Sequence, residues 1–438
     1  MAIFSKEEAK KIMEKALSFS TADSCEINMG GSESGNIRYA RNTVSTSGHQ
    51  SNQTLVVQAS FGKKTGTATI DEFTDAALER VVKRAEELAK LSPENPEFME
   101  PLGPQQYADS ITYQESTAKI TPEYRANVAE KSITPAMKKE VTAAGFLDDS
   151  AGFSALMNSK GLFAYNQSTN LDFTVTMRTN DGTGSGWVTR DYNDVNKFDA
   201  AEASQIAIEK ALMSREAKAI EPGKYTVILE PAASEDLLAN LFYSLNARTA
   251  DEGRSFMSKE GGGTKLGQQI VDERVNIWSD PLNPLVPSST WNGDGLPVTK
   301  TSWIENGVAK NLAYSRYWAE KQGVEPVPFP GNAIMDGGSA SLEDMIKDTK
   351  KGILVTRFWY IRTVDPQTLL YTGLTRDGTF YIENGRIKHP IKNFRFNESP
   401  IIMLNNLETL GQQVRVNGSL IPYMKIRDFT FTSLSDAV

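Results

Sequence analysis

Residues 221–280 read EPGKYTVILEPAASEDLLANLFYSLNARTADEGRSFMSKEGGGTKLGQQIVDERVNIWSD and mark a change in the character of the chain. Tyr225–Leu229 is a short apolar run rich in β-branched residues, and Pro231 ends it, so a strand is predicted here. Ser234 can cap a helix that follows. The apolar side chains of that helix recur at helical spacing: Leu237, Leu238, Leu241, Phe242 and Leu245. A strand that leads into a buried helix is a common position for catalytic side chains.

Length and composition indicate a multidomain globular protein. The 438 residues exceed what one hydrophobic core usually serves, and 39% hydrophobic with 23% charged residues is typical of soluble chains. No apolar run approaches the roughly 18 residues of a membrane span, so no membrane association is expected. The first 19 residues mix acidic residues with an amphipathic period, which argues against a signal peptide. One cysteine, Cys25, fits a reducing compartment, and a cytoplasmic location is expected.

Residues that could bind metal or nucleic acid are scarce. The two histidines, His49 and His389, lie far apart, and no HExxH, Cys/His or Ser-His-Asp constellation can be recognised. The formal net charge is −8, and no basic run or stripe occurs. We therefore expect no metal site in this chain and no direct contact with nucleic acid.

Residues 1–92 are predicted to form a helix, four strands and a second helix. Ser5 and Glu8 form a capping box for a helix that ends near Ser18, and an amphipathic period predicts the second helix over 74–91. Turns are expected at Gly30-Gly31 and at residues 62–63. The four strands are expected at 24–29, 35–44, 53–61 and 64–70.

The same order of elements is predicted again over residues 107–220. Residues 92–106 contain four prolines and are predicted to be a linker. Helices are expected over 121–144, with a break at Pro135, and over 199–215. The four strands between them are expected at 146–157, 161–168, 172–179 and 184–191. Residues 1–220 are therefore predicted to be one α+β domain built from a duplicated helix, four strands and helix.

Residues 221–438 are predicted to form a β-rich domain, which makes the fold class α+β. Ile304–Gly307 and Ile382–Gly385 both read IENG, and an Asn-Gly turn between strand-like flanks predicts a hairpin. Helices are expected at 314–323 and 342–351. Further strands are expected at 353–357, 401–404, 414–416 and 423–432.

Residues 178–187, RTNDGTGSGW, superficially resemble a nucleotide-binding loop. Such loops need a helix N-terminus that faces the phosphates, and no apolar helix begins directly after this segment. A hairpin turn between two strands is the better prediction.

Five blocks of this sequence resemble blocks of the TldD/PmbA (TldE) family, whose members are also described as proposed modulators of DNA gyrase. The blocks are NSKGLFAY (158–165), RTNDGTGSGW (178–187), LGQQIVDE (266–273), IENGVAKNL (304–312) and YIENGRIKHPI (381–391). The resemblance covers nearly the whole chain. It implies a cytoplasmic protein with an α+β N-terminal half and a β-rich C-terminal half, which dimerises around a central channel.

The resemblance also implies where zinc would bind in the TldD-like branch. That branch carries a HExxxH motif on the helix after the first strand of the C-terminal half, together with a late cysteine, and hydrolyses linear peptides. Zinc would polarise the scissile carbonyl and lower the pKa of a bound water, with the glutamate as general base.

This chain departs from the HExxxH pattern. An alignment on Leu237-Leu238 puts Ala239, Asn240 and Ser244 at the three motif positions. An alignment on Leu266-Gly267 instead puts Tyr243, Ser244 and Arg248 there. Neither set supplies a zinc ligand, and residues 411–433 contain no cysteine. The chain therefore resembles the PmbA/TldE branch, without its own metal or catalytic residues.

The function implied is that of a non-zinc subunit that helps to hold linear peptides for a zinc-bearing, TldD-like partner. The degenerate motif positions are candidates for peptide contact, and a homodimer of the chain alone stays open. One alternative is a self-associating regulator, as the gyrase description implies. Another is a stand-alone hydrolase that uses an unrecognised site. Its candidate side chains are Asp148, Asp149, Asp181, Asp294 and Ser244.

Overall fold

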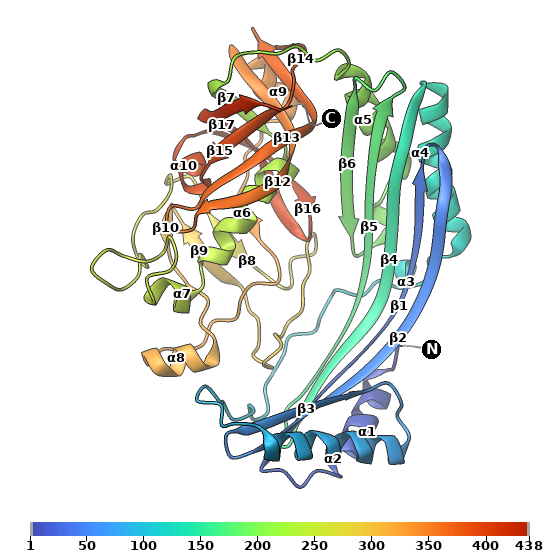
Figure 1. Cartoon of the computed structure of the whole chain (residues 1–438), viewed down its shortest axis with the longest axis vertical. Coiled ribbons are helices and arrows are strands. Elements are labelled where there is room, and N and C mark those ends of the chain that lie inside the picture. The colour runs from blue at the N-terminus through green and yellow to red at the C-terminus, as the bar shows by residue number, and fades with distance from the viewer. Residues whose placement is uncertain (1–2, 436–438) are drawn as a thin grey trace.

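Two β-sheets organise the chain (Figure 1), for which a computed structural model describes residues 3–435. The first sheet is antiparallel and has six strands in the order β3-β2-β1-β4-β5-β6. The strands are β1 (Ser24–Ala40), β2 (Thr43–Phe61), β3 (Lys64–Ile70), β4 (Val141–Asn158), β5 (Phe163–Thr179) and β6 (Ser185–Tyr192). Because β1 and β4 pair in its middle, the two predicted halves of residues 1–220 share one sheet. In the part of the chain that the structure describes, no helix is long and apolar enough to cross a membrane.

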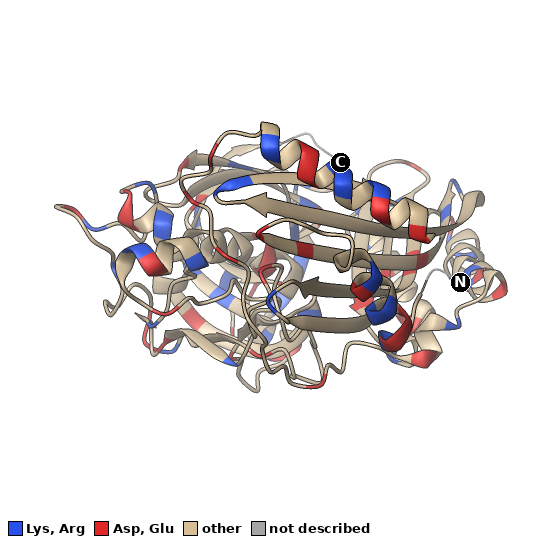
Figure 2. Cartoon of the chain, turned by 90° about the horizontal axis from the view of Figure 1, so that it is seen from below, with Lys and Arg blue, Asp and Glu red and all other residues tan. Residues whose placement is uncertain are grey.

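Helices pack on both ends of this sheet (Figure 1). α1 (Lys6–Leu17) and α2 (Asp75–Leu91) lie against one end, and α4 (Pro122–Lys138) and α5 (Ala200–Met213) lie against the other. The short helices α3 (Glu115–Ala118) and η1 (Val195–Lys197) lie in the connections. The predicted capping box is confirmed, because Ser5 Oγ accepts from the Glu8 N–H and the Glu8 carboxylate accepts from the Ser5 N–H. Figure 2 shows Lys and Arg interspersed with Asp and Glu along the helices.

The prediction of four strands in each half is wrong, because each half contributes three strands to the sheet. Two strands in each half are longer than predicted, whereas β3 and β6 lie where strands were expected. Gly30 and Gly31, expected as a turn, continue β1 and pair with Thr54 and Gln53 of β2. Their second neighbour is β4, which they pair with through Ser154 and Phe153. Pairing with β2 and β4 on both sides holds these two glycines in an extended conformation. The Gly-Gly pair by itself does not indicate which strands will flank it, so the strand could not be predicted locally.

The predicted helix over 121–144 is also too long. Val141 already begins β4, whose pairing with β5 starts at Thr179. Pro135 does not break α4 but lies inside it, about one turn before its end at Lys138. The other three helices predicted in the first 220 residues, α1, α2 and α5, begin and end within two residues of the predicted positions, whereas α3 and η1 were not predicted. The division of the chain into domains of 1–220 and 221–438 stays our proposal.

The second sheet has eleven strands, whose main path is β10-β9-β8-β11-β17-β15-β13-β12-β7. β14 joins β13, β16 joins β17, and β7 pairs with both β12 and β17, so part of the sheet closes on itself. Its strands are β7 (Gly223–Leu229), β8 (Ile277–Ser279), β9 (Thr301–Glu305), β10 (Val308–Ala309), β11 (Ile334–Met335), β12 (Lys351–Asp365), β13 (Leu370–Glu383), β14 (Arg386–Pro390), β15 (Phe394–Glu398), β16 (Leu407–Val416) and β17 (Ser419–Leu434). The residues after 220 are therefore β-rich, as predicted.

The helices of this region are short. They are α6 (Pro231–Ser244), α7 (Ala247–Asp251), α8 (Arg316–Gln322), α9 (Leu342–Lys347) and α10 (Pro400–Asn405). Both predicted Asn-Gly turns are confirmed: Asn306 and Asn384 have φ of 50° and 51° and connect β9 to β10 and β13 to β14. The strand predicted at 401–404 is wrong, because Ser399 caps α10 there and Pro400 occupies its first turn.

Candidate functional site beside helix α6

The strand and helix predicted at the start of the C-terminal half are confirmed as β7 and α6. The helix begins earlier than expected, at Pro231, after Glu230 at the N-cap position. Ser234 therefore lies within the helix, and its buried hydroxyl has no hydrogen-bond partner in the structure. The proposed role of Ser234 as a cap is wrong.

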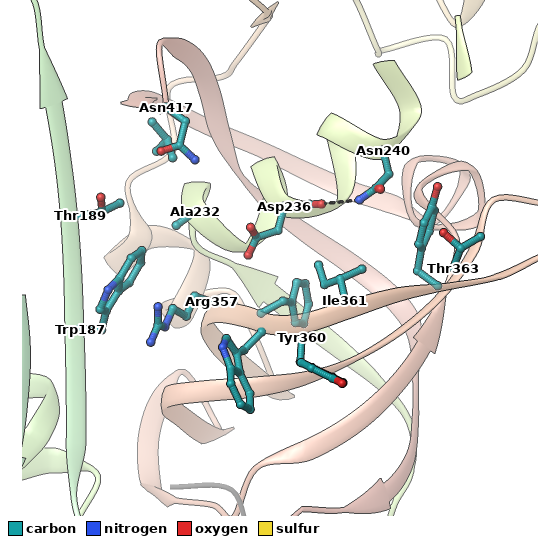
Figure 3. Close-up of a pocket in the computed structure, with 14 residues that line it drawn as sticks. Trp187, Thr189, Ala232, Asp236, Asn240, Arg357, Tyr360, Ile361, Thr363 and Asn417 are labelled. Atoms are coloured by element: carbon teal, nitrogen blue, oxygen red, sulfur yellow. Dashed lines mark hydrogen bonds between the residues drawn. The ribbon is translucent and has the colours of Figure 1, made fainter. Parts of the chain in front are cut away.

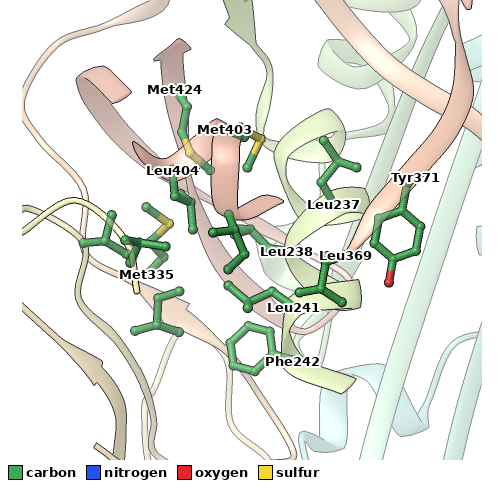
Figure 4. Packing of buried hydrophobic residues seen from close by; sticks show 14 of the residues in the cluster. Leu237, Leu238, Leu241, Phe242, Met335, Leu369, Tyr371, Met403, Leu404 and Met424 are labelled. Atoms are coloured by element: carbon green, nitrogen blue, oxygen red, sulfur yellow. The ribbon is translucent and has the colours of Figure 1, made fainter. Parts of the chain in front are cut away.

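One face of α6 is part of the main hydrophobic core (Figure 4). The side chains of this face are at most 8% exposed and comprise Leu237, Leu238, Leu241 and Phe242. Met403 and Leu404 of α10, Met335 of β11 and Met424 of β17 belong to the same cluster. This packing fixes the rotation of the helix and determines which of its side chains face outward.

The outward face of α6 lines a cavity of about 450 Å³ (Figure 3). The cavity lies between α6, the edge strand β6 of the first sheet, the second half of β12 and the turn between β16 and β17. Its lining comprises Trp187 and Thr189 of β6, Ala232, Asp236 and Asn240 of α6, Arg357–Ile361 and Thr363 of β12, Tyr371 of β13, and Val416 and Asn417 of the turn. Both sheets thus contribute to one site.

Ion pairs hold the edge of the first sheet against the C-terminal region beside this cavity. Arg415 of β16 donates to Asp191 of β6 with a distance of 2.9 Å between Nε and Oδ2, and both side chains are nearly buried. Gly418 N–H donates to the same carboxylate. Lys210 of α5 forms a half-buried pair with Glu230, at 2.6 Å, just before α6 begins. Two ion pairs therefore connect the first sheet and its helix α5 to the C-terminal region beside the cavity.

Asp236 is a half-buried carboxylate of the cavity (Figure 3). Its burial raises the pKa of the carboxyl to about 7, and the neighbouring Glu235 adds to the rise. The Phe358 N–H and the Arg357 guanidinium oppose this change because they favour the ionised form. Among the described residues, Asp236 forms no ion pair with a lysine or arginine. The carboxyl therefore changes protonation near neutral pH.

Arg357 is the cationic group of the same cavity. Its Nε and Nη2 donate to the buried Asp377 of β13, and its guanidinium carbon lies 4.2 Å from the centre of the Trp187 ring. The cation stacks on an aromatic face, which contributes roughly 0.5–2 kcal/mol in such pairs. Arg357 thus connects β12 to the edge of the first sheet, and within residues 3–435 its Nη1 forms no hydrogen bond.

The structure separates the residues at the degenerate motif positions. Asn240 lines the large cavity, and its Nδ2 donates to the Asp236 carbonyl at 2.8 Å. Ala239 and Tyr243 line a different cavity, of about 140 Å³. There the Tyr243 ring, 73% exposed, stacks on Phe329 with 6.1 Å between ring centres. Ala239 and Tyr243 therefore line the same small cavity, whereas Asn240 lines the larger cavity together with Asp236.

The other two positions are engaged in local structure. Ser244 is buried and donates to the Leu241 carbonyl at 2.7 Å, as a hydroxyl near a helix end often does. Arg248 lies on α7 and forms ion pairs with Glu97 and Glu252. Neither side chain lines a cavity with Asn240. Peptide contact by the five positions stays a proposal, and the geometry favours Asn240, Ala239 and Tyr243 for it.

The carboxylates considered for a stand-alone hydrolase lie in separate places. Asp149 forms a buried bidentate pair with Arg125. Asp181 accepts from Arg215 and from residues of the β5–β6 turn, which confirms the predicted hairpin. Asp294 lies at another cavity, beside Glu26. The structure therefore assembles none of them with Ser244.

The side chains on α6 do not fit a zinc ion. A zinc site in a protein is built from imidazole, thiolate and carboxylate ligands, usually three or four of them. Ala239 offers a methyl group, Asn240 an amide, and the Ser244 hydroxyl is already donated. Cys25, the single thiol, is buried in the first sheet. Over residues 3–435, no group of three or more His, Cys, Asp or Glu side chains could hold a metal ion.

Two sheets, α6 and the cavity between them define a two-part α+β protein that matches a family of metallopeptidases. The family models that match describe PmbA/TldA metallopeptidase domain 1 at residues 25–89, the central domain at 101–215 and the C-terminal domain at 222–433. Because these matches cover most of the chain, it belongs to the PmbA/TldD metallopeptidase family.

Relatives in sequence include proteins of archaea and bacteria. An uncharacterized protein of Methanocaldococcus jannaschii is 27% identical over 63% of this chain and 67% of its own length. A metalloprotease of Methanothermobacter thermautotrophicus is 25% identical over 61% of this chain and 62% of its own length. The metalloprotease PmbA of Escherichia coli O157:H7 is 25% identical over 37% of each chain. The chain thus spans about two thirds or less of these relatives.

Solved structures show the same fold over nearly the whole chain. TldE from Thermococcus kodakarensis matches with a TM-score of 0.87 at 18% identity, and 97% of this chain and 99% of that chain are covered. A Thermotoga maritima protein, described as a proposed modulator of a DNA gyrase, matches with a TM-score of 0.87 at 19% identity, covering 97% and 100%. The predicted α+β class and family resemblance are therefore confirmed.

Sequence reasoning did not single out Asp236, Arg357 or Trp187. Asp236 precedes the motif position Asn240 by four residues, so helical spacing could have placed the two on one face. Arg357 and Trp187 are 170 residues apart in the chain, and no local pattern indicates that they meet.

Proposed function

We propose that this chain is a TldE-like, non-zinc subunit of a cytoplasmic peptidase whose TldD-like partner holds the zinc and cleaves linear peptides. The observation that carries the proposal is the set of side chains on α6. One alignment puts Ala239, Asn240 and Ser244 where the resemblance implies His, Glu and His. The other puts Tyr243, Ser244 and Arg248 there, and neither set fits zinc. The helix nevertheless keeps a full hydrophobic face, so its place in the core is preserved without the ligands.

The cavity beside α6 supports a role in holding substrate. Five aromatic side chains, one acidic group and one basic group line a space large enough for several atoms of a peptide. A binding surface of this kind would complement a catalytic site in another subunit. Assembly with a TldD-like partner is the arrangement we propose, and a homodimer of the chain alone is the competing one.

The test begins with protein purified without a histidine tag. We expect the chain alone to contain no stoichiometric zinc by mass spectrometry of metals and to leave a fluorogenic linear peptide uncut. After mixing with the TldD-like protein of the same source, we expect one co-eluting complex and faster cleavage than by that protein alone. A partner with its first motif His changed to Ala serves as control and should cleave nothing. Zinc with cleavage by the chain alone, or failure to co-elute, contradicts the proposal.

A further inference from the structure

The edge strand β6 of the first sheet is open where it faces the cavity. Both backbone groups of Ser185 form hydrogen bonds with the Ser214 side chain. The Ser214 Oγ accepts from the Ser185 N–H and donates to the Ser185 carbonyl, each at 2.8 Å. In an antiparallel ladder, bonded and non-bonded pairs alternate, so every second residue points its backbone groups away from the neighbouring strand. Ser185 pairs with Arg178, and it belongs to the non-bonded set.

Trp187 and Thr189 belong to the same set as Ser185. They pair with Thr176 and Thr174 of β5, two and four residues further along the ladder. Their backbone N–H groups therefore point away from β5, toward the cavity that both residues line. The Thr189 carbonyl accepts from Arg190 Nη1 at 3.0 Å. The outward N–H groups of Trp187 and Thr189 and the Trp187 carbonyl are thus available to a further strand.

The opposite wall carries an irregularity in β12. The pairing of β12 with β13 shifts between Trp359 and Arg362, and Tyr360 lies in this bulge with a φ of 56°. A bulky residue with positive φ is uncommon and costs about 1–3 kcal/mol, and such strain is often found at binding sites. Trp359, Tyr360 and Ile361 all line the cavity. The bulge therefore directs part of β12 toward the open edge of β6.

The charged side chains at the site differ in the partners that they have. Glu235 accepts from Asn417 Nδ2 at 3.0 Å and is engaged with the β16–β17 turn. Arg357 is compensated by Asp377 through two of its nitrogens. Asp236 faces the cavity that Trp187 also lines, and among the described residues it forms no ion pair, although the Arg357 guanidinium favours its ionised form (Figure 3). The acidic group that forms no ion pair among the described residues lining this cavity is therefore Asp236.

We propose that an extended linear peptide adds to the open edge of β6 in this cavity and places a lysine or arginine side chain against Asp236. The peptide backbone would accept from the Trp187 and Thr189 N–H groups, and Arg357 Nη1 could donate to one of its carbonyls. The cavity of about 450 Å³ lies within the usual range of roughly 300–1,000 Å³ for ligand sites. This proposal rests on the proposed function, because the bound peptide would be the substrate that the chain presents to its partner.

Binding to the purified chain alone tests this site without the partner, so failure here differs from failure of the assembly. The probes are fluorescein-labelled, unstructured decapeptides that carry at the centre a single lysine, or norleucine in its place. Fluorescence anisotropy should show that the lysine peptide binds about tenfold more tightly than the norleucine peptide, because only lysine can form a charge-assisted hydrogen bond with Asp236. Equal affinity for the two peptides, or no binding at millimolar peptide, would overturn the proposal.

Two variants assign the contact to its residue. Asp236→Asn should lower the affinity for the lysine peptide about tenfold and leave that for norleucine unchanged. Asp365→Asn, at the end of β12 and outside the cavity lining, should change neither. Equal effects of the two variants on the lysine peptide refute the role of Asp236.

The strand-addition step has its own test. Thr189→Pro deletes an N–H that the ladder does not use and should weaken both peptides alike. N-methylation of the peptide at alternate residues makes the same test without a variant and should abolish binding in one of its two registers. Binding that is insensitive to both changes would show that the peptide does not add to β6.

Discussion

The buried ion pair between Arg125 of α4 and Asp149 of β4 allows a stability prediction that also tests the role of Asp149. Arg125 Nε and Nη2 lie 2.6 and 2.8 Å from the two carboxylate oxygens, and each side chain is 6% exposed. Gly35 of β1 makes room for the pair, because a Cβ there would lie 1.9 Å from Arg125 Nη2. The guanidinium therefore lies directly on the sheet, without access to water.

Asp149→Ala would leave a buried guanidinium without its partner. Loss of one member of a buried pair usually costs about 3–5 kcal/mol, and we expect a loss of that size here. Replacing both members, by Arg125→Met with Asp149→Leu, should restore the free energy of unfolding to within about 1 kcal/mol of the wild type, since hydrophobic replacements of buried pairs are often neutral or stabilising.

Hydrogen exchange read by mass spectrometry is the suitable assay, because a chain of this size need not unfold in one step. The free energy of opening is measured for amides of α4 and β4, and amides of β8 and β9 in the second sheet serve as an internal reference. A loss below about 1 kcal/mol in Asp149→Ala, or a double variant as unstable as the single one, would refute the reasoning. A stabilising role of this kind would account for a buried carboxylate at position 149 without any catalytic function, which was the alternative considered for a stand-alone hydrolase.

Three further predictions concern α6 and its surroundings. Leu241→Ala should lower the free energy of unfolding by about 2–5 kcal/mol, measured by urea denaturation, because the side chain is 1% exposed in the core. The pKa of Asp236 is raised on folding, so the folded state retains a proton that the unfolded state releases above about pH 4, and stability should fall as the pH rises from there to about 7. Urea midpoints across that range should show this fall in the wild type and a smaller one in Asp236→Asn. Arg248→Met removes an ion pair with Glu97 that is 40% exposed on each side, and thermal unfolding should reveal a loss of no more than about 1 kcal/mol.

Local signals in the sequence were sufficient for some of the helices and turns. Ser5 with Glu8 caps α1, and Asn306-Gly307 and Asn384-Gly385 turn their hairpins, because each depends on neighbours within a few residues. The leucines of α6 likewise indicated its buried face through helical periodicity alone. The lack of zinc ligands at the motif positions was also visible in the sequence, given the family resemblance.

Only the tertiary structure decided the extent of the strands and the composition of the site. Gly30 and Gly31 lie within a strand because β2 and β4 flank them, and neither neighbour is adjacent in the sequence. Trp187 and Arg357 come from the two sheets and Asp236 comes from α6, and they meet because ion pairs hold the sheets together beside α6. Local propensity acts over a few residues, whereas ladder pairing and burial depend on partners that only the folded chain brings together.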